Sequence, residues 1–110
     1  MDSYYRPEDL PRFEEVGQNA SEAWKAFMAW YGPLMQAGHL SKREKALIAL
    51  AVSHSEKCPY CIDAYTQSCL ENGITLDEMT EAVHVAAAMR AGVTLAHGVQ
   101  MRNVAQNLSF

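Results

Sequence analysis

The sequence predicts an all-α protein of about five or six helices. Apolar residues recur at three- and four-residue spacing, two capping-box sequences precede apolar runs, and nothing alternates as a strand would. The chain fits one domain, residues 1–110, without a repeat or linker. We expect residues 1–18 to be an extended lead-in with at most a short helix, because Pro7, Pro11 and Gly17 punctuate them.

The first full helix is expected to begin at Asn19 or Ser21. Gly32-Pro33 should kink or split this helix, because Pro33 cannot donate to the carbonyl one turn back. Gly38 should end it. The apolar face consists of Trp24, Phe27, Met28, Tyr31, Leu34 and Met35.

A second helix is expected to open with "SKRE", where Ser41 can cap and Glu44 can close a capping box. It should run to about Ser55. Its body, "ALIALAV", is apolar all round, which predicts a helix buried on every side.

A third helix should follow a tight connection at Glu56-Lys57, with Pro59 in its first turn. Gly73 is expected to stop it.

The sequence "TLDE" (Thr75 to Glu78) forms a second capping box, which predicts a helix to about Arg90. Gly92 is then expected to separate this helix from a last one that reaches roughly Asn107.

Composition and charge exclude several classes of protein. The net charge of −4 disfavours binding to nucleic acid or to an anionic membrane, since both require a basic face. The longest apolar run, Ala46 to Val52, is too short to span a bilayer, and the N-terminus has no secretory signal, so we expect a cytoplasmic protein. An apolar content of 49% indicates that another subunit covers some apolar surface.

The sequence "HSEKCPYC" contains a CxxC pair, Cys58 and Cys61, at the predicted start of the third helix. Cys58 falls at the N-cap and Cys61 in the first turn. Unpaired N–H groups and the helix dipole there stabilise a thiolate, and one helical turn lets the two sulfurs meet. This pattern favours dithiol redox chemistry. Cys69, two turns after Cys61, is interpreted as a core residue.

Two alternatives compete with the redox interpretation. His54, Cys58 and Cys61 could bind a metal, with His84 or His97 as a fourth ligand. Against this, the chain has no second CxxC or HxxxH, and its apolar helices should fold without metal, so no metal or cofactor is expected. The cysteines could also be small buried residues without chemistry.

The segments "REKALIALAVSHSEKCPYCIDAYTQSCLENG" and "EAVHVAAAMRAGVTLAHG" resemble the carboxymuconolactone decarboxylase/AhpD-like superfamily, an all-α group whose redox branch contains CxxC alkylhydroperoxidases. The resemblance runs from about Phe13 to Met101. With the opening "MDSYYRPEDL", the chain is most similar to peroxidase-like proteins associated with arsenosugar biosynthesis.

The resemblance implies a cycle in which a thiolate attacks a peroxide and the sulfenic acid condenses with the partner cysteine to a disulfide. The partners would be a peroxide substrate and a thiol reductant. It also implies a homo-oligomer (dimer, trimer or hexamer). It points to Cys61 as the attacking sulfur and Cys58 as the resolving one, whereas the position at the helix terminus favours Cys58.

The chain departs from the family's proton relay at two positions. The relay glutamate, twelve residues before the first cysteine, is replaced by Ala46, and the relay histidine, four residues after the second, by Tyr65. A tyrosine with an ordinary pKa of about 10 can donate a hydrogen bond but does not readily take a proton at neutral pH.

Three residues could supply the missing base. His54 ends the second helix near the cysteines, where an imidazolium would stabilise a thiolate; it could equally be a structural cap or exposed. His84, in "AVHVAAAM", could reach the site or be a hydrogen-bonded core residue. Glu44 lies two residues before the missing glutamate, about 200° around the helix, and its capping role explains it without chemistry. Tyr60 is expected to form a partly exposed wall of the pocket.

The sequence therefore leads to two main hypotheses. The first is a thiol-dependent (alkyl)hydroperoxide reductase that cycles Cys58 and Cys61. The second is a non-catalytic accessory protein whose paired thiols bind an arsenical or a metal. Lactone decarboxylation has the least support, because it leaves the CxxC without a role.

Overall fold

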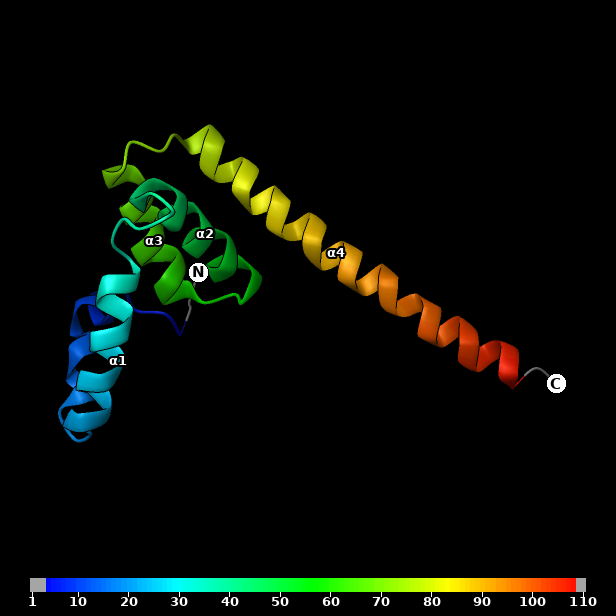
Figure 1. The fold of residues 1–110 in the computed structure, drawn as a ribbon, viewed down its shortest axis with the longest axis horizontal. Coiled ribbons are helices and arrows are strands. Elements are labelled where there is room, and N and C mark those ends of the chain that lie inside the picture. Colours follow the sequence, from blue (N-terminus) through cyan, green and yellow to red (C-terminus); the bar gives the residue numbers. More distant parts are fainter. Residues whose placement is uncertain (1–3, 109–110) are drawn as a thin grey trace.

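The computed structural model describes residues 4–108, which form a 3-10 helix and four α-helices. None of these residues forms a strand, so the all-α prediction is confirmed. No helix in this part of the chain is long and apolar enough to cross a membrane. Two arms extend from a small core in Figure 1. The elements are η1 (Pro7–Gly17), α1 (Ser21–Leu34), α2 (Lys42–Ser55), α3 (Pro59–Glu71) and α4 (Leu76–Asn107).

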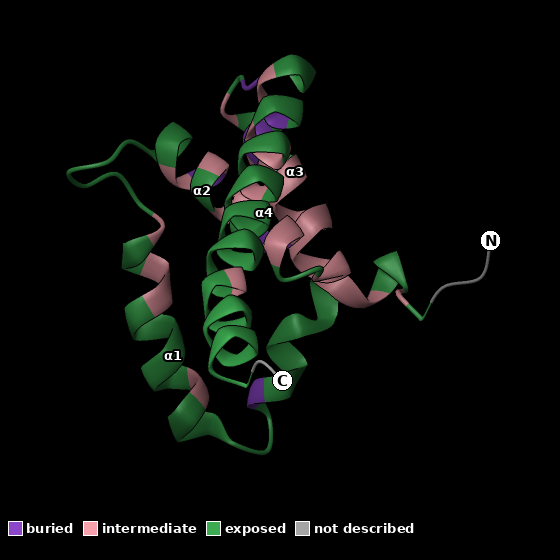
Figure 2. Ribbon diagram, turned by 90° about the vertical axis from the view of Figure 1, so that its right-hand side faces the viewer, coloured by how far each residue is buried: buried purple, intermediate pink, exposed green. Residues whose placement is uncertain are grey.

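The core lies where α2 packs against α3 and against the first turns of α4. Its members are buried and come from all three helices and from the connection between α3 and α4. Figure 2 shows this small buried region beside the largely exposed α1 and α4. The core residues are Ala46, Leu50, Cys69, Ile74 and Met79, with Leu47 and Tyr65 packed against them.

Both predicted capping boxes are present. The Ser41 hydroxyl accepts from the Glu44 N–H at 3.0 Å, and the Ser41 N–H donates to the Glu44 carboxylate at 2.9 Å. Thr75 and Glu78 repeat this arrangement at 3.1 and 3.0 Å. Arg43 also pairs with Glu78, so the N-terminus of α2 is tied to that of α4.

The turns at both ends of α3 are Schellman motifs, in which the residue after the C-cap is left-handed. Gly73 takes this position after α3 with φ +72°, and the Ile74 N–H donates to the Cys69 carbonyl at 3.0 Å. Lys57 takes it after α2 with φ 56°, and the Cys58 N–H donates to the Ser53 carbonyl at 3.0 Å. The tight connection before α3 and the stop at Gly73 are therefore confirmed.

The N-terminal arm differs from its prediction. Pro7–Gly17, expected to be mostly extended, is a 3-10 helix that folds back against α1. The reversal is tight, because a Cβ on the buried Gly17 would lie 2.4 Å from the Trp24 ring. Residues 1–3 of the predicted lead-in lie outside the described residues.

Helix α1 begins at Ser21, one of the two predicted starts, and ends at Leu34, four residues before Gly38. Pro33 lies in its last turn and does not split it. The Lys45 ammonium from α2 donates to the Leu34 and Gln36 carbonyls, both at 2.6 Å, and so satisfies groups at this helix end.

The predicted break at Gly92 is wrong, because α4 continues through it to Asn107. A glycine inside a helix costs only about 1 kcal/mol relative to alanine, and no packed neighbour redirects the chain there. Met79, Ala82, Val83 and Ala86 are at least partly covered, whereas in residues 87–107 only Gly98 is not exposed. We call residues 76–86 the proximal segment of α4 and residues 87–107 the distal segment.

The prediction that α2 is buried on every side is also wrong for the single chain. Ala46, Leu50 and Ser53 are buried on the side that faces α3 and α4. Ile48 and Val52, on another side, are 51% and 54% exposed. One apolar face of α2 is therefore left without cover.

Candidate functional site

Cys58 and Cys61 lie together at the start of α3. Cys58 is the N-cap residue, and its sulfur accepts from the Cys61 N–H at 3.3 Å. Both cysteines are free and partly buried. Their Sγ atoms are 2.9 Å apart, which is within reach of a thiol–thiolate hydrogen bond and close enough for a disulfide to form after a small movement. The predicted helix position of both residues is confirmed.

The surroundings shift the pKa values of the two thiols in opposite directions. The pKa of Cys58 is lowered by the hydrogen bond from the Cys61 thiol and by the backbone N–H groups of Cys61 and Tyr60. Burial, and then the neighbouring Cys58 sulfur, raise the pKa of Cys61 to about 11. Both effects favour a Cys58 thiolate held by a protonated Cys61. The directions of the two pKa shifts favour the helix-terminus argument for Cys58, and which sulfur attacks stays a prediction.

Both sulfurs open into a cavity of about 720 Å³ between η1, α1 and α3. Its lining is mostly apolar and aromatic, with three charged residues from η1. Tyr60 belongs to the lining, as predicted for a wall of the pocket. The lining residues are Asp9, Leu10, Arg12, Phe13, Glu15, Val16, Tyr31, Cys58, Tyr60, Cys61, Ala64 and Tyr65.

The N-terminal arm is attached to α3 next to the cysteines. The Tyr5 hydroxyl donates to the Asp63 carboxylate, and the Tyr5 ring meets the Tyr60 ring edge-on with centroids 4.7 Å apart. The hydrogen bond to Asp63 raises the pKa of Tyr5 to about 12, and it holds the pKa of Asp63 below its usual value. These contacts attach the segment before η1 to α3 beside the two cysteines, and residues of η1 line the same cavity as the sulfurs.

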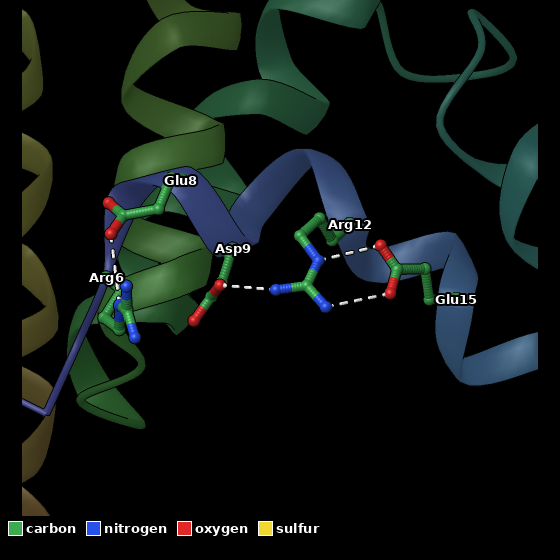
Figure 3. A network of polar contacts seen from close by, with 5 residues as sticks. All are labelled: Arg6, Glu8, Asp9, Arg12 and Glu15. Atoms are coloured by element: carbon green, nitrogen blue, oxygen red, sulfur yellow. Dashed lines mark hydrogen bonds and ion pairs between the residues drawn. The ribbon is translucent and has the colours of Figure 1, made fainter.

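The charged residues of the lining are paired with one another on η1. Arg12 donates from Nε to Glu15 at 2.8 Å and from a terminal nitrogen to Asp9 at 3.2 Å. Figure 3 shows Arg12 between these two carboxylates, with Arg6 paired separately to Glu8. The hydrogen bonds from Arg12 lower the pKa of Glu15. The three charged residues of the lining are therefore all paired, and together they leave one net negative charge beside an otherwise apolar and aromatic lining.

Two tyrosine side chains line the cavity together with the two cysteines. Tyr65, which follows Cys61 by one helical turn, lines the cavity and also packs against the core. Tyr31 reaches the same cavity from α1, where its ring stacks on Phe27 at 5.3 Å. Burial, and then repulsion from Cys61 once that thiol is itself ionised, raise the pKa of Tyr31. Tyr31 therefore remains protonated at neutral pH and can donate a hydrogen bond.

Of the six predicted site residues, the cavity brings together Cys58, Cys61 and Tyr65. His54 lies in the last turn of α2, with Nδ1 2.8 Å from the Leu50 carbonyl. Glu44 closes its capping box, and hydrogen bonds from Ser41 lower its pKa.

His84 is exposed on the proximal segment of α4, which packs against α2. Along with His54 and Glu44, it is absent from the lining of the cavity. Their roles as relay residues remain predictions.

The proposed metal ligands are not gathered into a site. Among residues 4–108, no group of three or more His, Cys, Asp and Glu side chains is placed to hold a metal ion. Cys69, interpreted as core, is buried at 0% exposure.

Sequence reasoning missed the contribution of the N-terminal arm. Asp9, Arg12 and Glu15 follow one another at intervals of three residues, a spacing that favours ion pairs on a helix. Their pairing could therefore have been predicted from the sequence. The contact between Tyr5 and Asp63 could not have been predicted in this way, because 58 positions separate the two residues in the sequence. Tyr31 was assigned to an apolar face, and only tertiary packing places it with the cysteines.

Comparisons with known proteins agree with this fold. The model of the family described as "Carboxymuconolactone decarboxylase family" matches residues 21–101. "Uncharacterized protein 4 in cox locus" from Paracoccus denitrificans is 43% identical over 72 residues, which cover 66% of this chain and 65% of that protein. The match thus spans about two thirds of the length of this curated relative.

A crystal structure of a structural-genomics target from Methanobacterium thermoautotrophicum superposes with a TM-score of 0.73 and 32% identity. The superposition covers 76% of this chain and 94% of that one. Because the family model covers well over half of the residues, including both sulfurs of the cavity, the chain belongs to the carboxymuconolactone decarboxylase family.

Proposed function

We propose that this protein is a thiol-dependent hydroperoxide reductase that cycles between a Cys58–Cys61 dithiol and a disulfide. The observation that carries the proposal is the pair of free sulfurs 2.9 Å apart at a helix N-terminus, open to a largely apolar cavity. Membership of a family that includes AhpD-like peroxidases supports it. A reducing compartment such as the cytoplasm would suit three free cysteines.

In the first step, the Cys58 thiolate attacks one peroxide oxygen. The O–O bond breaks, a sulfenic acid forms on Cys58, and the other oxygen leaves as an alkoxide that takes a proton to become an alcohol. The lowered pKa of Cys58 supplies the thiolate, and the apolar lining suits an organic hydroperoxide. The two electrons that reduce the peroxide come from sulfur.

In the second step, the Cys61 sulfur attacks the sulfenic sulfur of Cys58. A disulfide forms, and the hydroxyl leaves as water with the proton of the Cys61 thiol. Conversion of Cys58 to a neutral sulfenic acid removes one of the causes that raise the pKa of Cys61. The first step therefore favours the second. An external dithiol then reduces the disulfide by thiol–disulfide exchange.

The alkoxide would leave inside a cavity whose lining includes Tyr31 and Tyr65. The Tyr31 hydroxyl, kept protonated by its raised pKa, is our candidate donor for this oxygen, with Tyr65 as a second phenol in the lining. We expect Tyr31→Phe to lower peroxide turnover by about 10-fold or more. A normal rate in Tyr31→Phe with a reduced rate in His54→Ala would instead place the proton path at His54.

Peroxide consumption with a dithiol donor tests the function, with mass spectrometry of the treated protein. Wild type should gain one Cys58–Cys61 disulfide, and Cys58→Ser should consume no peroxide. Cys61→Ser should stop at a sulfenic acid on Cys58 that dimedone traps. The matched control is Cys69→Ser, which removes a thiol outside the cavity. Unmodified thiols in wild type would refute the proposal, and a trapped sulfenic acid on Cys61 would reverse the roles.

The second candidate is an accessory protein that binds a trivalent arsenical, or another soft ion, through both sulfurs. The close sulfur pair favours it, since thiolates prefer soft ions. The expected resemblance of the sequence to peroxidase-like proteins associated with arsenosugar biosynthesis is the second reason for considering it. Stoichiometric arsenite binding that requires both Cys58 and Cys61, without peroxide consumption, would establish this alternative.

A further inference from the structure

Half of the residues that line the cavity lie outside the part of the chain that matches the family. The match begins at residue 21, so it includes α1, α3 and both sulfurs. The remaining lining comes from η1, which precedes the match, and consists of Asp9, Leu10, Arg12, Phe13, Glu15 and Val16. The sulfurs and tyrosines of the cavity therefore belong to the shared segment, and η1 completes the cavity from outside it.

The conformation of η1 depends on contacts with the rest of the chain. It is an 11-residue 3-10 helix. Runs of more than about four residues are uncommon in this conformation, because its hydrogen bonds have poor geometry. Pro7 and Pro11 fix two of its φ angles but donate no hydrogen bond. Contacts outside η1 must therefore hold it at the cavity.

One such contact lies at the C-terminal end of η1. The Phe13 ring meets the Trp24 ring edge-on with centroids 5.1 Å apart. The buried Gly17 lies against the same indole, since a Cβ there would be 2.4 Å from the Trp24 ring. This end of η1 is therefore packed against α1.

The contact at the N-terminal end leads to the helix that carries the sulfurs. Tyr5, shortly before η1, donates from its hydroxyl to the Asp63 carboxylate on α3, and its ring meets the Tyr60 ring edge-on. Asp63 also accepts from the Gln67 amide at 2.6 Å. Hydrogen bonds to an ionised carboxylate are stronger than those between neutral groups. Tyr5 thus connects the N-terminal half of η1 to α3.

The η1 side of the cavity has apolar area that its own chain leaves uncovered. Phe13 and Val16 line the cavity and are 54% and 69% exposed. Covering such area favours a ligand roughly in proportion to the apolar surface removed from water. Hydrogen peroxide has no apolar group to cover it, whereas an organic hydroperoxide has one. A volume of about 720 Å³ suits a small organic molecule.

The charges of the lining favour a neutral ligand. Arg12 is paired with Asp9 and Glu15, so these three residues leave one net negative charge. A thiolate at Cys58 adds a second. A carboxylate on the substrate would be repelled by both charges, and among the described residues that line the cavity it would find no unpaired cation.

We propose that η1 determines substrate specificity by contacting the organic group of a neutral, bulky hydroperoxide, and that Tyr5 is the residue that positions η1. The inference rests on the proposed reductase activity and adds to it the substrate class and the segment that selects it. The peroxide group would lie at Cys58 and the organic group against Phe13 and Val16. Tyr5 acts through η1 and not on the reacting atoms.

The first test compares cumene hydroperoxide with hydrogen peroxide as substrates of the full chain. Tyr5→Phe keeps the ring but removes the hydroxyl that donates to Asp63. We expect its kcat/KM for cumene hydroperoxide to fall about 10-fold, chiefly through KM, without a change for hydrogen peroxide. The matched control, Tyr4→Phe, removes a hydroxyl from a side chain that is 77% exposed and should affect neither substrate. Equal losses for both peroxides, or no loss, would overturn the positioning role.

A binding measurement separates this inference from the proposed function. Cumyl alcohol, the product of cumene hydroperoxide reduction, can be titrated into the reduced protein by NMR without any peroxide. Its Kd should rise about 10-fold in Tyr5→Phe and stay unchanged in Tyr4→Phe. Such binding in a protein that consumes no peroxide would refute the reductase and support η1 as a binding wall. Peroxide turnover without binding that depends on Tyr5 would overturn the inference and leave the reductase.

The acceptor of the hydrogen bond gives an independent variant. Asp63→Asn should weaken cumyl alcohol binding in the same direction as Tyr5→Phe. The double variant should lose no more than the larger single loss, because both changes remove one contact. Additive losses would overturn this contact as the cause.

A fatty-acid hydroperoxide and its methyl ester test the choice of a neutral substrate, because they differ only in charge. We expect the wild type to reduce the ester about 3-fold faster or more. Asp9→Asn removes the net negative charge of the lining and should narrow this difference. Equal rates for acid and ester in the wild type would overturn the neutral class.

Discussion

The proximal and distal segments of α4 have similar apolar side chains but opposite surroundings. The proximal segment begins with a capping box, an ion pair to Arg43 and the buried Met79, and it packs against α2. The distal segment is just as rich in Ala, Val and Met, yet almost all of it is exposed. Apolar composition alone therefore does not create a core: the proximal segment is stabilised by what faces it.

The largest effect should come from the packed region. Leu50→Ala removes a side chain that is 1% exposed, so we expect a loss of about 2–5 kcal/mol in the free energy of unfolding, measured by urea denaturation. Leu95→Ala truncates the same side chain at 78% exposure, and its effect should vary with protein concentration if a second copy covers it. A loss below about 1 kcal/mol for Leu50→Ala would contradict the assignment of the core.

The caps should rank next. Thr75→Ala removes the hydroxyl that accepts from the Glu78 N–H, and Ser41→Ala does the same to α2, so each should cost about 1 kcal/mol. Thr94 is the control in the distal segment, where its hydroxyl donates to the Arg90 carbonyl inside the helix. Thr94→Ala should be neutral or slightly stabilising in thermal denaturation, and equal losses at all three sites would refute the capping assignment.

Two glycines separate the effect of backbone conformation from that of helix propensity. Gly73→Ala forces alanine to φ +72° and should destabilise the protein by about 1 kcal/mol. Gly92→Ala has open space around its Cβ and should stabilise the helix by roughly 0.5–1 kcal/mol. Both changes can be measured by thermal denaturation. Destabilisation by Gly92→Ala would show that another chain approaches the helix closely there.

The smallest effect is expected from acid. The Thr75 backbone N–H, and then Arg43, lower the pKa of Glu78 from 4.5 to about 2. Because the pKa is lower in the folded state, this carboxylate stabilises the fold fully above about pH 4.5, and the contribution is lost as the pH falls towards 2. Glu78→Gln should therefore flatten the decline of the melting temperature over this range. An unchanged pH profile would exclude Glu78 as an acid-sensitive link between α2 and α4.

Local signals predicted much of the fold because their causes are local. The capping boxes at Ser41 and Thr75, the stop at Gly73 and the CxxC at the start of α3 each depend on residues within one or two turns. The break at Gly92 was predicted on the same grounds and is wrong. A glycine only weakens a helix, and whether the chain turns there depends on what it can pack against.

The sequence by itself determined the limits of α2 and α3, the start of α4 and the place of both reactive sulfurs on one helical turn. The physical reason is that caps and left-handed stops depend only on residues within a turn of the helix end. Tertiary structure alone decided which residues surround the sulfurs. It brought Tyr5 and Tyr31 to the CxxC, and it left His54 and His84 out of the cavity. Such contacts depend on how distant surfaces fit together, and no periodicity in the sequence encodes that fit.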